Sequence, residues 1–204
     1  MNRNIGVLIS GRGSNLQAII DAVGDGRLDA RIALVVSNRA DAYGLVRASE
    51  AGIETMVVDH KAHASREAFE RVLVDGLRAR DVRLVCLAGF MRLLGATFVG
   101  AFPNAILNIH PALLPAFPGL HAQRQAFDHG VKVAGATVHF VDTNLDAGPI
   151  VLQAAVPVLD EDTEDTLADR ILAQEHRLYP AAIQRVLDGR WSIAGRRVVF
   201  AEAE

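Results

Sequence analysis

The sequence predicts an α/β fold, a single doubly wound and mostly parallel sheet with helices on both faces. Short apolar runs alternate with longer amphipathic patterns at intervals of about 25–30 residues, which is typical of βαβ units with right-handed crossovers. The first run, Ile5–Ser10, is nearly continuous in apolar residues, as expected of a strand covered on both faces. A glycine-rich turn follows it directly and leads into a helical pattern.

The first half of the chain supplies the parallel strands. Helical spacing of apolar residues after the first turn runs through Leu16, Ile19, Ile20 and Val23. A second helix is expected over about Tyr43–Ala51, and a third from about Ser65, which reads as an N-cap. The expected strands are Ile5–Ser10, Ile32–Ser37, Thr55–Val58, Leu84–Ala88 and Ala105–Ile109.

The regular alternation of expected strands and helices ends after residue 110. Four Pro and Gly residues between 111 and 119 exclude a helix or a central strand there. We expect a short helix around His121–His129, then two strands, Ala136–Val141 and Pro149–Val156, forming an added hairpin. The acidic run Asp160–Asp165 caps a last long helix over about Glu164–Leu187. Because no linker interrupts this order, we expect a single domain over 1–204, with halves of about 1–100 and 101–204.

Composition excludes several classes of protein. The 204 residues exceed a typical domain length of roughly 150 only modestly. With 21 basic against 24 acidic residues, the net charge of −3 gives no cationic field for nucleic acid. The single cysteine, Cys86, excludes an internal disulfide and indicates a reducing compartment. No run approaches the ~20 apolar residues of a bilayer span. We therefore expect a cytoplasmic protein that binds neither nucleic acid nor membrane, as a monomer or homodimer.

The turn at Gly11-Arg12-Gly13-Ser14-Asn15 is the first candidate site. Glycines let backbone N–H groups surround an anion, and the helix that follows adds its positive end. The turn lacks the Lys of a Walker A loop, and Leu16 stands where a dinucleotide fingerprint needs its third glycine. The spacing therefore fits a single phosphate, and it fits a plain tight turn equally well.

A second candidate lies at the end of the fifth strand, in Asn108-Ile109-His110-Pro111. Residues two apart on a strand point to the same side, so Asn108 and His110 project together at the carboxyl edge, where open α/β sheets bind ligands. An amide can donate to an oxyanion and an imidazole can move a proton. A third candidate, Asp146, would favour the imidazolium if it lay near His110. A polar strand end and an ordinary turn residue remain alternatives for these positions.

Other polar residues carry weaker signals. His60 and His63 lack the carboxylate of a zinc motif and are expected in a surface loop. Cys86 lies inside an apolar strand and is expected to be a buried, inert thiol. His139 is expected in the core or behind the site, and Trp191 in a packing role in the C-terminal tail. No cluster indicates a metal.

Taken together and in this order, the segments resemble phosphoribosylglycinamide formyltransferases, folate-dependent enzymes of purine synthesis. The matching pieces span nearly the whole chain: Leu8–Ile20, Leu87–Leu94, Leu107–Pro115, Phe117–Gln125, Thr137–Phe140, Leu145–Gln153 and Gln174–His176. The HPxLLP and LDxGP pieces are shared by the wider group of 10-formyltetrahydrofolate enzymes. The SGxGSN and FPGLH pieces indicate the glycinamide ribonucleotide branch.

The resemblance implies transfer of the formyl group of 10-formyltetrahydrofolate to the amine of 5'-phosphoribosylglycinamide, through a tetrahedral intermediate and without a metal. It implies that Asn108 and His110 stabilise the oxyanion and that Asp146 keeps His110 protonated. The products are formylglycinamide ribonucleotide and tetrahydrofolate, in the synthesis of IMP. Residues 1–100 would then be the phosphate-binding half and 101–204 the folate-binding and catalytic half.

The resemblance also implies binding roles. The expected substrate-binding residues are Gly11, Arg12, Gly13, Ser14, Asn15 and Glu175, although the side chain of Arg12 matches no role of its own. The expected folate-binding residues are Arg66, Met91, Arg92, Leu93, Leu94, Asn108, Asp142 and Asp146. Arg66 matches a cation near the glutamate tail of the folate.

Rival functions share parts of this pattern. A formyltransferase acting on another amine, such as a tRNA or a sugar amine, normally has a longer chain. A formyltetrahydrofolate deformylase usually carries an N-terminal regulatory domain, whereas here the fold starts at residue 5. A folate- or nucleotide-binding module without activity would most plausibly have lost Asn108, His110 or Asp146, and all three are present.

Overall fold

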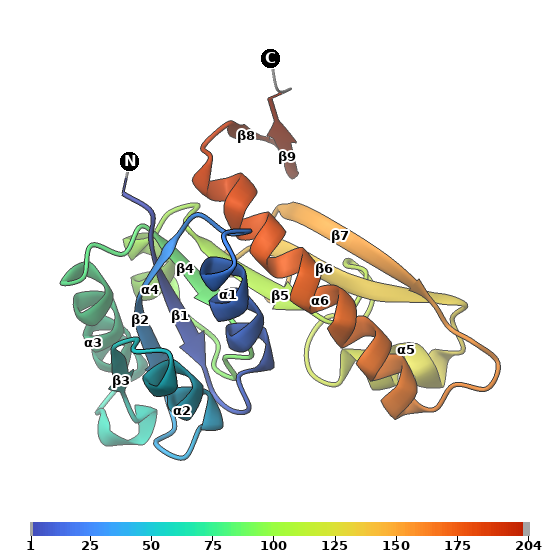
Figure 1. The fold of residues 1–204 in the computed structure, drawn as a ribbon, viewed down its shortest axis with the longest axis horizontal. Coiled ribbons are helices and arrows are strands. Elements are labelled where there is room, and N and C mark those ends of the chain that lie inside the picture. Colours follow the sequence, from blue (N-terminus) through green and yellow to red (C-terminus); the bar gives the residue numbers. More distant parts are fainter. Residues whose placement is uncertain (1, 202–204) are drawn as a thin grey trace. The chain divides into compact units, whose positions relative to one another are not determined.

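A computed structural model describes residues 2–201. The chain divides into two compact units, Met1–Leu107 and Asn108–Glu204. Strand β5 (Ile106–His110) crosses the boundary, so that its first two residues belong to the first unit and the last three to the second. Figure 1 shows the elements of both units, coloured along the chain.

The sheet of the first unit is parallel and centred on β1 (Asn4–Ile9). Strands β2 (Arg31–Ser37) and β4 (Leu84–Leu87) pair with β1 on either side, and the short β3 (Thr55–Val57) pairs with β2 (Figure 1). Every residue of β1 after Asn4 is buried, as its apolar sequence predicts for a central strand.

Four helices and one 3₁₀ turn connect these strands. Helix α3 begins after the Ser65 N-cap, whose hydroxyl accepts a hydrogen bond from the N–H of Ala68 at 3.1 Å. Its apolar stripe is buried at Phe69, Leu73 and Leu77. The bounds are α1 Ser14–Gly24, α2 Tyr43–Glu50, 3₁₀ turn η1 His60–Ala62, α3 Arg66–Arg78 and α4 Ala96–Ala101.

The second unit is built on an antiparallel pair, β6 (Val133–Phe140) and β7 (Ile150–Pro157). The short helix α5 (Ala122–His129) precedes this pair. The long helix α6 (Glu164–Leu187) follows it and packs on both strands (Figure 1). Helix α6 opens with a capping box in which Thr163 and Thr166 exchange hydrogen bonds.

A second hairpin, β8 (Trp191–Ala194) with β9 (Arg197–Phe200), continues this sheet, because β9 pairs in parallel with β7. Several contacts tie the hairpin to the rest of the unit, and two of them reach β6 and the loop that follows it. The ring of Trp191 lies 4.9 Å from that of Phe140, and the guanidinium of Arg196 donates to the carbonyl of Ala147 at 2.8 Å.

The fold class predicted from the sequence is confirmed. Followed along their hydrogen bonds, the strands are ordered β3-β2-β1-β4-β5-β6-β7-β9-β8, mostly parallel in the first unit, with helices packed against the sheet, the expected added hairpin and the long α6. Cys86 is buried in β4, as expected. Within residues 2–201, no helix has both the length and the apolar character needed to cross a membrane.

The sequence pattern missed four short elements, α4, η1, β8 and β9. Helix α4 has only six residues, and its first amides are satisfied by the carboxylate of Glu70 on α3, a contact between distant residues. The stretch expected as loop at His60 and His63 contains the turn η1, which Asp59 caps. Trp191, expected in a tail, lies in β8 and packs on Phe140 as a strand residue.

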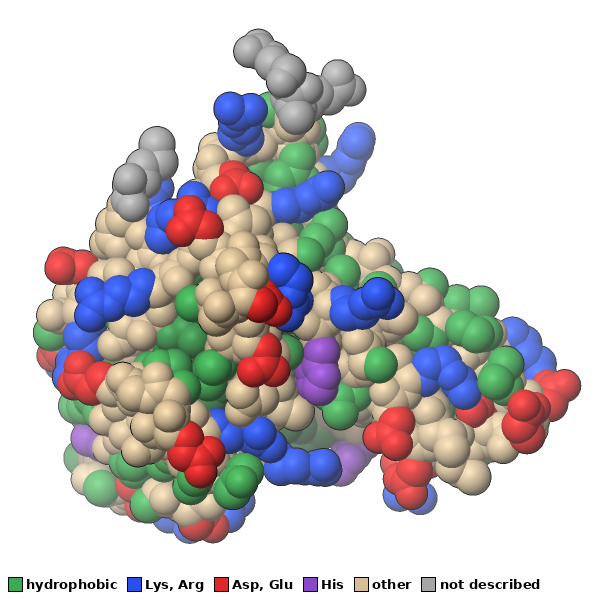
Figure 2. All heavy atoms as spheres, in the orientation of Figure 1, with side chains coloured by type: hydrophobic (Ala, Val, Ile, Leu, Met, Phe, Trp, Pro, Cys, Tyr) green, Lys and Arg blue, Asp and Glu red, His purple; other side chains and the backbone are tan. Residues whose placement is uncertain are grey.

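Charged side chains of both signs are interspersed on the molecular face drawn in Figure 2. This pattern agrees with the nearly balanced count of basic and acidic residues.

Gly135 in β6 provides a test of the packing in the second unit. A Cβ at this position would lie 2.1 Å from the carbonyl oxygen of Ala154 on β7, whereas a Cβ at Gly100 in α4 would meet nothing within 4 Å. We expect Gly135→Ala to lower the free energy of unfolding by about 1–3 kcal/mol. The control, Gly100→Ala, should be neutral or stabilising by about 0.5–1 kcal/mol. Chemical denaturation measures both, and equal stability of the two variants would contradict the strand register.

Candidate active site

A carboxylate between two histidines forms the centre of the candidate site, all within the second unit. Asp146 Oδ2 lies 3.5 Å from His110 Nδ1, and Asp146 Oδ1 lies 3.7 Å from His139 Nε2. The side chains of both histidines are almost fully buried, and that of Asp146 is only 10% exposed. Asn108 completes the group, with its Nδ2 3.2 Å from His139 Nε2. We call these four residues the Asp146 cluster.

Strand geometry explains how the cluster forms. Asn108 and His110 stand two residues apart on β5, so their side chains leave the same face of the strand. His139 comes from β6, and Asp146 from the loop between β6 and β7. The structure therefore brings together all three catalytic residues predicted from the sequence, with His139 linking Asn108 to Asp146.

The two nitrogens of His110 both face acceptors. Nδ1 faces the Asp146 carboxylate, and Nε2 lies 2.8 Å from the carbonyl oxygen of Phe117. A carbonyl oxygen only accepts, so this contact requires a proton on Nε2. An imidazolium can donate to both partners at once, which makes the surroundings of His110 those of a proton donor.

The ring of His139 is fixed in a similar way. Its Nδ1 donates to the carbonyl of its neighbour Phe140 at 2.9 Å, which leaves Nε2 directed at Asn108 and Asp146. Such a hydrogen bond to a backbone carbonyl sets the orientation of a histidine ring. His139 is 2% exposed, which confirms the expectation that it lies in the core.

The loop that carries Asp146 is held in a constrained conformation. Asp146 has φ 47°, in the left-handed region, and its Oδ2 accepts a hydrogen bond from the N–H of Gly119 at 2.8 Å. A Cβ at Gly148 would lie 1.8 Å from the carbonyl oxygen of Phe140, so only glycine permits this approach of the loop to β6. The backbone thus fixes where the carboxylate lies.

The pKa of Asp146 is lowered by its partners. Burial alone would raise the pKa, because it penalises the charged form. Three influences outweigh burial and hold the pKa below its ordinary value of 3.8: the nearby Nε2 of His139 at 3.7 Å, the hydrogen bond from the N–H of Gly119, and the charges of the His110 and His139 rings. Asp146 is therefore ionised at neutral pH and stabilises positive charge on the neighbouring rings.

The proline-rich segment is anchored from the strand pair. The hydroxyl of Thr137 on β6 donates to the carbonyl of Ala112 at 2.7 Å and accepts from the N–H of Leu114 at 3.0 Å. The amide of Gln153 on β7 donates to the carbonyl of Leu114 at 2.9 Å. These bonds fix the start of the segment whose later residues, Phe117 and Gly119, contact the Asp146 cluster.

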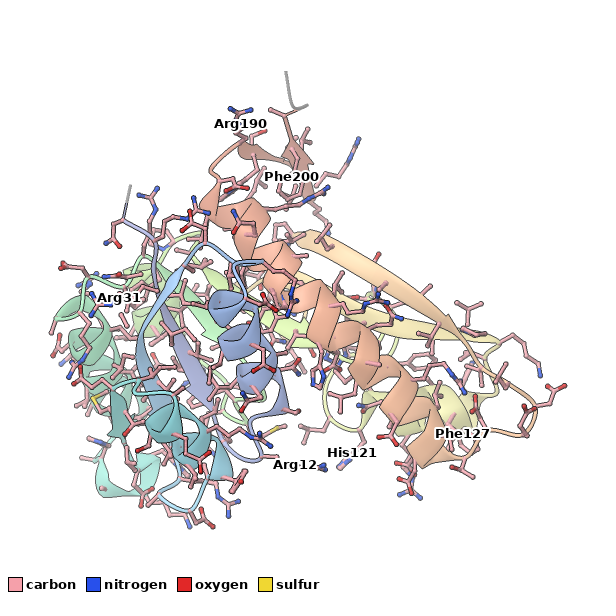
Figure 3. All side chains as sticks on the ribbon, viewed as in Figure 1. Arg12, Arg31, His121, Phe127, Arg190 and Phe200 are labelled. Carbon is pink, nitrogen blue, oxygen red and sulfur yellow. The ribbon has the colours of Figure 1, made fainter. Side chains whose placement is uncertain are left out.

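The predicted phosphate loop, residues 11–15, lies in the first unit between β1 and α1; we call it the glycine loop. Gly13 is the N-cap of α1, with φ 71°, and has no side chain that could accept from the first-turn amides. No acidic residue lies in that turn. Gly11 and Arg12 are exposed, and Figure 3 shows the Arg12 side chain extending from the loop. An uncapped N-terminus of this kind suits an anion.

The predicted folate-binding residues of the first unit lie on two segments. Met91 and Leu93 are 65% and 67% exposed, while Leu94 is buried and Arg92 is exposed. The N–H of Met91 donates to the hydroxyl of Ser10 at 2.8 Å, which ties this segment to the end of β1. Arg66, half-exposed at the start of α3, donates to Glu70 at 3.0 Å.

Two further predicted residues lie in the second unit. Asp142 accepts a hydrogen bond from the N–H of Asn144 at 2.7 Å and thereby shapes the loop that carries Asp146. Glu175, on α6, is only 5% exposed. It is thus a buried carboxylate rather than a solvated acid on a helix surface, and such a group is rarely buried unless it is paired.

Sequence reasoning missed the backbone contacts of the site. The carbonyl of Phe117 and the N–H of Gly119 bind cluster residues, but backbone groups leave no trace in residue identity. The position of His139 could have been inferred from the sequence, because Thr137 and His139 stand two residues apart on β6 and therefore point to the same side of the strand. Among residues 2–201, no group of three or more His, Cys, Asp or Glu side chains is placed to hold a metal ion.

Both the sequence and the structure match known proteins. The formyl transferase family model matches residues 3–183. The chain belongs to the formyl transferase family. The phosphoribosylglycinamide formyltransferase of Escherichia coli K12 is 49% identical over 187 residues, covering 92% of this chain and 88% of that protein. The resemblance predicted from the sequence is confirmed.

Two more members of the family extend the comparison. The trifunctional purine biosynthetic protein adenosine-3 of Drosophila melanogaster is 49% identical over 189 residues; the match covers 92% of this chain but only 14% of that protein. A crystal structure of glycinamide ribonucleotide transformylase 1 from Symbiobacterium toebii is 59% identical, with a TM-score of 0.96, and the match covers 98% of this chain and 95% of that one.

The lowered pKa of Asp146 predicts how stability depends on pH. A carboxyl whose pKa is depressed on folding stabilises the protein above its unfolded-state pKa, near 3.8, and this contribution is lost as the pH falls through the folded-state pKa. We therefore expect the difference in unfolding free energy between wild type and Asp146→Asn to shrink as the pH falls from about 5 to about 2.5. Urea titrations at several pH values measure it. A difference that grows towards acid would contradict the assigned pairing.

Proposed function

We propose that this chain transfers the formyl group of 10-formyltetrahydrofolate to the amine of 5'-phosphoribosylglycinamide, giving formylglycinamide ribonucleotide and tetrahydrofolate in purine (IMP) biosynthesis. The observation that carries the proposal is the Asp146 cluster, a buried carboxylate that supports a proton-donating histidine next to an amide, in a chain of this family. Acyl transfer needs an oxyanion stabiliser and a proton donor, and the cluster supplies both.

The reaction proceeds by addition and elimination. The amine nitrogen attacks the formyl carbon, and the carbonyl oxygen becomes an oxyanion that accepts hydrogen bonds from His110 and the amide of Asn108. The attacking amine then loses a proton to a water molecule, which relays it to His110 after that ring has given up its own proton. Collapse of the tetrahedral intermediate breaks the bond to the folate N10, which takes up a proton donated by His110. Asp146 favours the charged form of His110 before this proton is donated and after it has been replaced.

Binding roles follow from the family and remain part of the proposal. The glycine loop and Glu175 bind the ribonucleotide, with the phosphate at the N-terminus of α1. The exposed apolar side chains of Met91 and Leu93 are separated by one residue and offer an apolar surface for the flat folate ring. The proposed folate-binding residues are Arg66, Met91, Arg92, Leu93, Leu94, Asn108, Asp142 and Asp146.

We further propose a single formyltransferase domain over 1–204, in which about 1–100 bind phosphate and about 101–204 bind folate and carry the catalytic residues. The partners are the two small-molecule substrates. We propose a cytoplasmic monomer or homodimer that uses neither a nucleic acid nor a membrane partner. The nearly balanced charge and the single buried cysteine support this assignment.

A spectrophotometric assay with 10-formyl-5,8-dideazafolate tests the function. We expect turnover only when glycinamide ribonucleotide is present, because the amine is the acceptor of the formyl group. Turnover without the ribonucleotide would indicate that water is the acceptor and that the protein is a deformylase. Absence of turnover in both conditions would overturn the proposed reaction.

The role of His110 predicts the effect of its removal. We expect His110→Ala to lower kcat at least about 100-fold, because both the oxyanion contact and the proton donor are lost. The KM values of both substrates should change little. His63→Ala, which removes a histidine in the first unit, serves as the matched control and should retain wild-type kcat. Equal kcat in His110→Ala and wild type would contradict the mechanism.

A further inference from the structure

Helix α2 binds the carbonyl groups of the glycine loop, within the first unit. The N–H of Gly44, in the first turn of α2, donates to the carbonyl of Gly11 at 3.0 Å. One turn later, Arg47 Nε donates to the carbonyl of Arg12, also at 3.0 Å. The third carbonyl, that of Gly13, accepts from the N–H of Gln17 in α1 at 2.9 Å. Three successive carbonyls of the loop are thus engaged by helices.

Two glycines permit this close approach. A Cβ at Gly13 would lie 2.7 Å from Gly44 Cα, and a Cβ at Gly44 would lie 2.5 Å from Ile9 Cδ1 and 3.3 Å from Gly13 Cα. A side chain at Gly13 would push α2 away from the loop, and one at Gly44 would displace the Ile9 side chain and crowd the loop backbone. The sequence therefore keeps the backbone of α2 against the backbone of the loop, where Gly44 and Arg47 reach its carbonyls.

The guanidinium of Arg47 has two further contacts that hold it in place. Its Nη1 donates to the side-chain carbonyl of Gln17 at 3.1 Å, and its Cζ lies 4.9 Å from the centre of the Tyr43 ring. Gln17 is itself the residue whose N–H binds Gly13. Arg47 thus connects α2, the glycine loop and the first turn of α1, and its planar group suits several simultaneous hydrogen bonds.

The engagement of these carbonyls matters for an anion. Carbonyl oxygens repel a phosphate, whereas backbone N–H groups attract it, so a phosphate loop works when its carbonyls are turned away and its N–H groups converge. A loop rich in glycine is otherwise free to rotate its peptide groups. A charged donor on the Arg12 carbonyl opposes that rotation.

We propose that Arg47 is a positioning residue for recognition of the substrate phosphate: it holds the Arg12 carbonyl away from the phosphate and fixes the glycine loop in its binding conformation. The inference rests on the proposed function, in which this loop binds the phosphate. Arg47 acts through the loop, so its effect is specific to ligands that carry the phosphate and does not extend to the formyl-transfer step.

The test compares Arg47→Ala with wild type using two acceptors, glycinamide ribonucleotide and the riboside that lacks the phosphate. For the ribonucleotide we expect KM to rise about tenfold, while kcat and the KM of the folate stay within about twofold. For the riboside, kcat/KM should be the same in both proteins. Arg47→Lys should fall between wild type and Arg47→Ala, because a lysine keeps the charge but not the planar group.

Arg27→Ala is the matched control. It removes one positive charge from the same unit, in the turn that follows α1, where Arg27 pairs only with Asp25 among the described ion pairs. It should leave the KM of the ribonucleotide unchanged, which separates loop positioning from a general change of charge. Thermal melting of all variants confirms that they are folded.

Two outcomes would overturn the inference. An unchanged KM for the ribonucleotide in Arg47→Ala would show that the loop keeps its conformation unaided. An equal loss with the riboside would show that Arg47 supports the fold and not the phosphate site. The failure of the proposed function has a different signature, since wild type itself would then not formylate the ribonucleotide.

Discussion

The candidate site depends on a charged carboxylate held in a nearly buried place. Asp146 stays ionised because two histidines and one backbone N–H offset the cost of removing it from water. Neither histidine would be held in the same way without it, since the carboxylate faces a ring nitrogen of each. The strained φ of Asp146 and the close approach of Gly148 to β6 are the backbone conditions for this placement. A local distortion is thus retained because it positions the charge.

In both units, hydrogen bonds join the backbone of a loop to a charged side chain. In the second unit, backbone groups of a loop orient charged side chains: the carbonyl of Phe117 binds His110, and the N–H of Gly119 binds Asp146. In the first unit the relation is reversed, because Arg47 binds a loop carbonyl and leaves the amides of the glycine loop for a ligand. In each case a glycine allows two backbones to meet where a Cβ would separate them.

The larger elements could be predicted from the sequence because their signals are local. The apolar run of β1 and the buried stripe of α3 are visible in residue spacing, and the i, i+2 relation of Asn108 and His110 needs only strand geometry. Helix α4 could not be predicted, because its six residues depend on a cap from Glu70 in another helix. Sequence spacing also could not place Asp146 beside His110, since that contact depends on the pairing of β6 with β7. The family resemblance supplied the role of Asp146 beside His110.

The position of the β8–β9 hairpin in the sequence determines when the loop that carries Asp146 gains its support during synthesis. Arg196 holds the carbonyl of Ala147, next to Asp146, and Trp191 packs on Phe140, whose carbonyl orients His139 (the hairpin region is marked by Phe200 in Figure 3). During synthesis on the ribosome, residues 108–146 emerge well before this hairpin. A nascent chain therefore carries every residue of the Asp146 cluster before it has the strands that brace the loop, and it completes this support only after residue 200 has been translated.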